Sequence, residues 1–255
     1  MSDFDRGATP RYGAGVARPG YAQIDQGLRA YMLGVYNHMV LGLALTGLAA
    51  LGTSMVAVTH DEAGFRHFTA FGQALYFSPL KWVVMLAPLA FIFFFTIRLD
   101  RMSAASARGI FLAFSAVMGV SMSWIFLVFT GASVAQVFFI TAAAFGGLSL
   151  YGYTTKRDLS AFGSFLVMGL WGLVIASLVN IFLQSSGLQW ALSIIAVAVF
   201  SGLTAWDTQG IKEMYIESDG YEVAAKKSIF GALRLYLDFI NLFQSLLYLM
   251  GNRNN

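Results

Sequence analysis

Long apolar stretches recur along the chain, and short segments that hold most of the polar and charged residues separate them. A helix needs about 20 mostly apolar residues to cross the hydrocarbon core of a bilayer, and seven of the stretches reach about that length. The pattern therefore predicts an all-α integral membrane protein with seven transmembrane helices. We expect these helices near residues 32–58, 79–98, 104–129, 133–155, 161–184, 188–208 and 228–250.

The segments outside the apolar stretches define the rest of the organisation. Residues 1–30 are rich in Gly, Pro and Arg and contain no apolar stretch, so they predict a flexible cytoplasmic tail and not a cleaved signal peptide. Residues 31–251 form the predicted seven-helix membrane domain, and residues 252–255 form a short outer tail. The links TGAS and QSSG predict two tight hairpins, whereas the longest predicted loops are 59–78 and 209–227.

The composition agrees with a membrane protein. Hydrophobic residues make up 58% of the chain and charged residues 11%, whereas about a quarter of the residues in a soluble domain are charged. The chain contains no cysteine, which excludes disulfides, thiolate metal sites and cysteine nucleophiles.

The cations are distributed unevenly between the two sides of the predicted bundle. If the N-terminus lies inside, the inner side holds Arg6, Arg11, Arg18, Arg29, Arg98, Arg101, Arg108, Lys156, Arg157, Lys212, Lys226 and Lys227, and the outer side holds Arg66, Lys81 and Arg253. Because Lys and Arg concentrate in cytoplasmic loops, we expect a multi-pass protein of the cytoplasmic (inner) membrane, with the N-terminus in the cytoplasm and the C-terminus outside. These cations mark topology, so the net charge of +3 indicates no nucleic-acid partner.

Two acidic residues lie within the predicted helices. The chain has 13 acidic residues, and all except Asp207 and Asp238 fall in predicted tails or loops. Asp238 follows Lys227 by about eleven residues, which is roughly 16 Å along the last helix. An ionised carboxylate at such a depth costs at least about 2.5 kcal/mol on insertion scales, so the two acids need a physical explanation.

The last predicted helix carries a polar stripe that includes Asp238. Its members recur at steps of four, three, four and three, which holds them on one helical face: Arg234, Asp238, Asn241, Ser245 and Tyr248. On the sixth helix, Ser201, Thr204, Asp207 and Thr208 gather in the same way. Polar faces avoid lipid, so we expect them to line a cavity or path inside the bundle. Asn241, Arg234, Thr204 and Ser245 are therefore candidates for pathway or ion-binding residues.

The predicted topology places Asp207 and Asp238 in the same half of the membrane. Their nominal depths differ by up to about 9 Å, a gap that a tilt or a helix break would close. If the carboxyls meet, they share one proton and form a latch between two helices. Loss of the proton, or binding of a cation such as Ca²⁺ to Asp207 and Asp238 together with Asn241 or backbone carbonyls, would force a rearrangement. The residues thus suggest a pH-sensitive gate on a cation path.

Simpler interpretations of the same residues stay open at this point. Asp207 can be the polar end of a helix at the inner interface. Asp238 can form an ion pair with Arg234 one turn earlier on its own helix. Arg98 lies at about the depth of Asp207, but on its own it is typical of an ordinary anchor on the cytoplasmic side.

Three segments together resemble the Bax inhibitor-1, or transmembrane Bax inhibitor motif, family in its bacterial branch. They are GLTAWDTQGIKEMY, LRLYLDFINLFQSLLYLMG and GGLSLYGYTTKRDLSAFGSFL, and the similarity runs from about Arg29 to Gly251. The resemblance implies a seven-helix fold in which the seventh helix is central and the other six surround it. It also implies a pH-dependent calcium leak, with calcium as the transported ion and no other cofactor.

The resemblance assigns roles to particular residues. It implies that Asp207 and Asp238 form a hydrogen-bonded pH sensor, joined by an arginine of the second helix. That arginine maps to Arg98, with Arg101 as the alternative. Trp206 stands where the family pattern leads us to expect tyrosine.

Other functions remain as alternatives. A stress regulator that transports nothing would bind a membrane protease or another membrane partner, with residues 1–30 as the natural contact segment. An intramembrane aspartyl protease would also carry two acids on its sixth and seventh helices, but its second acid lies in a GxGD motif, whereas Asp238 lies in YLDF. A retinal receptor needs a buried lysine, and the last helix has none after Lys227. Because the motif of an aspartyl protease is absent, we do not expect the protein to be an enzyme. The sequence leaves the oligomeric state open.

Overall fold

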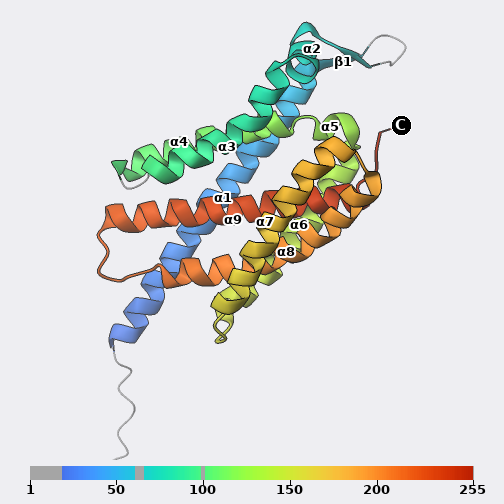
Figure 1. Cartoon of the computed structure of the whole chain (residues 1–255). Coiled ribbons are helices and arrows are strands. Elements are labelled where there is room, and N and C mark those ends of the chain that lie inside the picture. Colours follow the sequence, from blue (N-terminus) through green and yellow to red (C-terminus); the bar gives the residue numbers. More distant parts are fainter. Residues whose placement is uncertain (1–18, 61–65, 99–100, 255) are drawn as a thin grey trace, which may run out of the picture.

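The structure is a computed structural model that describes residues 19–60, 66–98 and 101–254 (Figure 1). Its long helices are α1 (Pro19–Ala57), α3 (Leu80–Arg98), α4 (Ala104–Met122), α6 (Gly131–Thr154), α7 (Ser160–Leu183), α8 (Ser186–Glu213) and α9 (Tyr221–Met250). The shorter elements are α2 (Ala70–Phe77), α5 (Ile125–Val128) and the antiparallel strands β1 (Val58–His60) and β2 (Arg66–Phe68). The fold is therefore helical throughout the bundle, with one small hairpin at its edge.

Short polar side chains begin several of these helices. Thr130 accepts a hydrogen bond from the backbone N–H of Ser133 at the start of α6, and Ser185 accepts one from Leu188 at the start of α8. Such caps satisfy backbone donors that a helix leaves free in its first turn. Gln184 adopts a left-handed conformation at φ 49° and ends α7. These residues form the tight hairpins that TGAS and QSSG predict.

Several helices extend beyond their apolar stretches. Helix α1 begins at Pro19, so residues 19–30, which the sequence assigned to a flexible tail, are helical; residues 1–18 of that tail lie outside the described residues. Helix α8 continues to Glu213, and α9 begins at Tyr221. The length of an apolar stretch shows how much of a helix is in contact with lipid. The helix itself can be longer, because its polar ends continue into the interface.

Two other segments differ from the prediction in kind. The expected loop 59–78 contains the β-hairpin and α2, and Thr69 caps α2 through the N–H of Gly72 at 3.0 Å. The expected helix 104–129 is broken after Met122, where Ser123 donates its side-chain hydroxyl to the carbonyl of Val120 at 2.7 Å. Hydroxyls that bond the preceding turn compete with the regular helical pattern, and here one stands at the break.

Six helical segments of the described chain are long and apolar enough to cross a membrane: α1 from Gln26, α3, α4 with α5, α6, α7 and α8. Helix α9 is 30 residues long and is not among them. It packs against α1, α4, α6 and α8, whereas α3 packs chiefly against α4 and α7 against α8. Figure 1 shows α9 between α4 and α8. Helix α9 thus packs against four other helices, whereas α3 and α7 have fewer neighbours.

One buried tyrosine of α9 holds three helices together. Tyr236 is fully buried, and its hydroxyl lies 2.6 Å from Thr46 Oγ1 of α1. Thr46 in turn donates to the carbonyl of Ser115 on α4 at 2.9 Å. The ring of Tyr236 meets Phe111 and Phe114 of α4 edge to face. Hydroxyls that bond across helices satisfy polar groups inside the bilayer and fix how the helices meet.

Candidate functional site

The candidate site lies where α8 crosses α9. Asp207 of α8 is 6% exposed and Asp238 of α9 is 5% exposed. Their carboxyl groups lie within hydrogen-bonding reach of each other. The carboxyls meet although counting along the helices predicted different depths, and α8 continues past residue 208 to Glu213. Asp207 therefore lies six residues inside the helix, about 9 Å from its end.

An arginine of α9 accompanies the two acids. Arg234 donates a hydrogen bond from its guanidinium to Oδ1 of Asp207 and forms an ion pair with it. The same guanidinium lies 5.5 Å from the ring centroid of Trp206. The interpretation that Arg234 pairs with Asp238 one turn away is therefore wrong, because the partner is the acid on the neighbouring helix. The interpretation of Asp207 as a solvated helix end is wrong as well.

Asp238 has one oxygen without a hydrogen-bond partner. Among the described residues, the buried side-chain atoms in this condition are Oδ2 of Asp238, the hydroxyl of Tyr31 and the hydroxyl of Ser228. A buried acceptor without a donor loses about 1–3 kcal/mol, and more when it is charged. The pair of carboxyls and the single guanidinium thus form a site that lacks one donor, which a proton held between the carboxyls would provide.

Known proteins share this sequence over nearly its whole length. The family described as "Inhibitor of apoptosis-promoting Bax1" matches residues 28–255, a range that contains both aspartates and Arg234. The chain belongs to the Bax inhibitor-1 family.

Relatives of this Bax inhibitor-1 family protein occur in distant bacteria. The inner membrane protein YbhL of Escherichia coli (strain K12) is 44% identical over 231 residues, which cover 89% of this chain and 93% of that protein. An uncharacterized protein of Rickettsia prowazekii (strain Madrid E) is 47% identical over 231 residues, or 91% of this chain and 93% of the relative. Another, from Caulobacter vibrioides, is 43% identical over 255 residues, or 99% and 100%. Together with the apolar helices, these matches identify a membrane protein of the family.

The arginine that the family resemblance assigned to the sensor lies elsewhere in this structure. Arg98 ends α3, is exposed, and has its guanidinium 5.8 Å from the ring centroid of Phe94 on the same helix. Arg101, the alternative, is exposed as well. Helix α3 packs chiefly against α4, so neither residue reaches α8 or α9 as Arg234 does. Arg234 takes the place beside the aspartates that we expected Arg98 to occupy.

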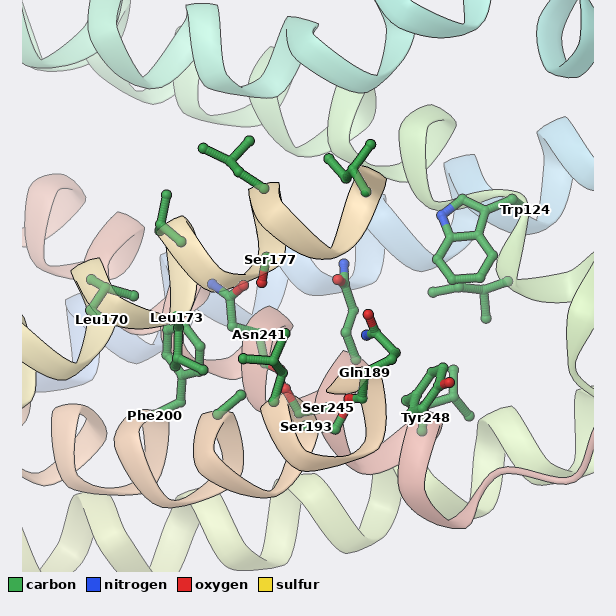
Figure 2. A pocket seen from close by; sticks show the side chains of 18 of the residues that line it. Trp124, Leu170, Leu173, Ser177, Gln189, Ser193, Phe200, Asn241, Ser245 and Tyr248 are labelled. Carbon is green, nitrogen blue, oxygen red and sulfur yellow. Dashed lines mark hydrogen bonds between the residues drawn. The ribbon is translucent and has the colours of Figure 1, made fainter. Parts of the chain in front are cut away.

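The C-terminal part of the polar stripe lines a cavity. A cavity of about 570 Å³ lies between α7, α8 and α9, and Asn241, Ser245 and Tyr248 are in its wall. Figure 2 shows the side chains of Ser177, Gln189 and Asn241 turned toward the space between the helices. Thr204, in contrast, is fully buried and donates to the carbonyl of Phe200 at 2.7 Å. Of the predicted pathway residues, Asn241 and Ser245 thus line a cavity, whereas Thr204 does not.

Sequence reasoning missed the polar residues that α7 and α8 contribute to this cavity. They are Ser177, Gln189 and Ser193. Gln189 accepts a hydrogen bond from Nδ2 of Asn180 at 3.1 Å, which ties α8 to α7 at the outer hairpin. Gln189 and Ser193 are four residues apart on an otherwise apolar stretch. That spacing was a signal for a shared helical face.

A second set of polar groups joins the site to α1. Thr208, the residue after Asp207, has its hydroxyl 2.9 Å from that of Ser149 on α6. The Ser149 hydroxyl also bonds the hydroxyl of Tyr36 on α1. Three helices are therefore connected by one chain of hydroxyls that begins next to the carboxyl pair. Sequence reasoning did not single out Ser149 or Tyr36.

The end of α6 and the loop that follows it are held against the C-terminal end of α8, close to the site. Gln209 accepts a hydrogen bond from the N–H of Leu159 at 2.9 Å and donates to the carbonyl of Arg157 at 2.8 Å. Lys212 donates to the carbonyl of Tyr153 at 2.9 Å. These bonds fix the loop between α6 and α7 against the last two turns of α8. The carboxyl pair thus lies close to an end of the bundle that hydrogen bonds hold together.

Proposed function

We propose that this Bax inhibitor-1 family protein is a pH-sensitive cation leak, with calcium as its cargo, and that the Asp207–Asp238 pair keeps it closed. The observation that carries the proposal is the meeting of two buried carboxyls with one guanidinium at the crossing of α8 and α9. With a proton between the carboxyls, the group of three is neutral. Without it, the group carries one net negative charge away from water.

The loss of that proton supplies the force for opening. Two carboxylates about 4 Å apart repel by on the order of 4 kcal/mol at an effective dielectric constant of 20. Arg234 brings one positive charge against two carboxylates, so one net negative charge is left, and Oδ2 of Asp238 has no hydrogen-bond partner. Either α8 and α9 separate or a cation enters. Both outcomes favour conduction at higher pH, and low pH favours the closed state.

The outer cavity is the proposed entrance to this gate. Its wall reaches Phe200 on α8 and Asn241 on α9, whereas the aspartates lie further toward the inner ends of these helices. Asn241 is three residues from Asp238, so the cavity stops about 4.5 Å short of the pair along α9. Phe200, Leu203 and Leu242 belong to one buried apolar cluster at this level. We take this cluster to be the closed part of the path.

The site suits a cation that passes and does not stay. Among the described residues there is no group of three or more His, Cys, Asp or Glu side chains that would hold a metal. Calcium takes six to eight oxygen ligands, so at Asp207 and Asp238 most of them must come from water, backbone carbonyls and Asn241. A cation bound by so few protein carboxylates is released readily. That property supports transport over storage.

Helix α9 is the proposed seventh and central membrane helix. Its 30 residues span about 45 Å, enough to cross the bilayer. Arg234 and Asp238 are turned toward α8, so α9 need not be apolar on every face to be embedded. With α9 as a span, the cation distribution supports an N-terminus in the cytoplasm and a C-terminus outside.

The alternatives differ in what they require of the aspartates. An aspartyl protease needs one acid to activate a water molecule, but Asp207 is occupied by Arg234, and Oδ2 of Asp238 is buried. A regulator that transports nothing needs no carboxyl pair inside the bundle. Neither alternative explains why three charged side chains meet between α8 and α9.

Calcium flux across a pH series tests the proposal. The purified protein is placed in liposomes, and wild type is compared with Asp207→Asn and Asp238→Asn; Asp158→Asn, in the exposed loop before α7, is the matched control. We expect flux in the wild type and the control to rise with pH, and both site variants to lose this dependence. Absence of calcium flux at every pH would refute the transport assignment. An unchanged pH dependence in both site variants would refute the gate.

A further inference from the structure

A groove between α1 and α6 is the strongest unassigned feature of the molecule. It has a volume of about 480 Å³ and is lined by Arg29, Met32, Leu33, Tyr36, Met39, Phe145, Gly146, Ser149, Leu150 and Tyr153. Helices α1 and α6 are not among the closely packed helix pairs, so the groove occupies the space between them. Met32, Met39 and Phe145 are buried and form its floor. Leu33 and Leu150 are exposed and form its rims.

The length and direction of the groove match one leaflet of a bilayer. On α1 it extends from Arg29 to Met39, which is about 15 Å of helix. The hydrocarbon core of a bilayer is about 30 Å thick, so the groove reaches from one interface to the middle. On α6 it runs from Tyr153, next to the end of that helix, inward to Phe145. An apolar furrow of this depth accommodates an acyl chain.

The interfacial end of the groove is positively charged. Arg29 is exposed there, and no hydrogen bond or ion pair joins it to another described residue. Lys212 does not line the groove, but it adjoins the lining residue Tyr153 at this end: its ammonium lies 5.3 Å from the ring centroid and bonds the carbonyl of that residue. Its ammonium has three N–H donors, and this bond uses one of them. The two cations and the apolar furrow together match an anionic headgroup above a hydrocarbon chain.

We propose that this groove binds an anionic phospholipid of the leaflet on the Arg29 side, with its phosphate at Arg29 and Lys212 and one acyl chain along Met32, Met39 and Phe145. The lipid lies against the Tyr36–Ser149–Thr208 hydroxyl chain, which ends beside Asp207. It is thus in position to influence the carboxyl pair. The binding itself does not depend on whether the protein conducts ions.

The glycines of α6 provide a matched pair of variants. Gly146 lines the groove, and a Cβ added there meets nothing within 4 Å. Gly147 is also open to a Cβ and is exposed, but it is not among the residues that line the groove. Gly146→Phe therefore fills the groove, whereas Gly147→Phe places the same ring on the adjoining lipid-facing surface. Arg29→Gln removes the charge and leaves the furrow open.

The test is lipid retention by the full-length protein in detergent, with phosphatidylglycerol and phosphatidylcholine of identical acyl chains as probes. Bound lipids are counted by native mass spectrometry. We expect wild type and Gly147→Phe to prefer phosphatidylglycerol, Arg29→Gln to lower its affinity about fivefold, as expected for one interfacial cation, and Gly146→Phe to remove the binding. Dissolved glycerol phosphate should not displace the lipid, because it has no chain for the furrow.

Three results would overturn the proposal. The first is equal retention of the two lipids by the wild type. The second is equal retention by Gly146→Phe and Gly147→Phe. The third is displacement by dissolved glycerol phosphate, which would show a phosphate site without a lipid requirement. A protein that fails to conduct calcium but shows the expected lipid pattern would refute the leak and leave this inference standing.

Discussion

Helices α7 and α9 are opposite in character although both are long helices of the same bundle. Helix α7 exposes large apolar side chains such as Phe165, Trp171 and Phe182, the last at 87% exposed. Helix α9 buries Leu235, Tyr236 and Leu242 almost completely and carries Arg234 and Asp238. In a bilayer the apolar surface faces outward to lipid, and charged groups face inward to partners. Exposed apolar side chains therefore mark α7 as a lipid-facing helix, whereas buried and charged side chains mark α9 as a helix that packs against other helices.

The largest effect expected from this difference is on stability. Arg234→Met leaves two buried carboxyls without their cation, and breaking a buried ion pair in this way costs about 3–5 kcal/mol. Thermal unfolding in detergent at constant lipid content measures the loss. The same substitution on the outer helix α3, Arg98→Met, should change stability by less than about 0.5 kcal/mol because Arg98 is exposed.

A double variant makes this comparison stricter. Asp207→Asn in the Arg234→Met background removes the excess charge, so we expect it to recover much of the lost stability. Non-additive behaviour of this kind identifies a direct interaction. If the two substitutions were simply additive, Arg234 would not be the cation that neutralises Asp207.

A smaller effect is expected from the hydroxyl that joins α9 to α1. Tyr236→Phe leaves Thr46 without this partner and should lower stability by about 1–2 kcal/mol. Tyr151→Phe, on the lipid-facing side of α6 where the ring is 49% exposed, is the control and should be nearly neutral. Thermal unfolding of both variants measures the difference. If both variants lost the same stability, the buried hydroxyl of Tyr236 would contribute no more than an exposed one.

The smallest effect is expected from the aromatic contact of Arg234. Trp206→Leu removes the ring that lies 5.5 Å from the guanidinium, and such contacts contribute about 0.5–1 kcal/mol where water reaches the cation, as it does at Arg234. Trp171→Leu on α7 serves as the control, since Trp171 is 63% exposed. Unfolding measurements on this tryptophan pair would contradict the account if the α7 variant lost more stability than the α8 variant.

The sequence predicts the helices best where contact with lipid determines their length. The apolar stretches located α3, α6 and α7 to within two residues at each end, because the thickness of the bilayer directly limits such stretches. The start of α1 at Pro19 and the extension of α8 to Glu213 were missed. There the chain leaves the membrane, and capping and local hydrogen bonds determine where a helix ends.

The candidate site was predictable in its acids and not in its cation. Asp207 and Asp238 stood out because no loop contained them, and the structure brings their carboxyls together. Arg234 is four residues before Asp238, so its spacing suggested a pair within α9. The crossing of α8 over α9 instead directs it to Asp207. Contacts across helices depend on rotation and tilt, which periodicity on a single helix does not determine.

The pH dependence of calcium flux in Asp238→Asn tests the central claim most directly. Asparagine keeps the size of the side chain but cannot release a proton in this pH range, so α8 and α9 never face two negative charges. We predict that flux through this variant in proteoliposomes stays constant across a pH series in which wild-type flux rises with pH. A variant that still opens at the same pH as the wild type would contradict the account.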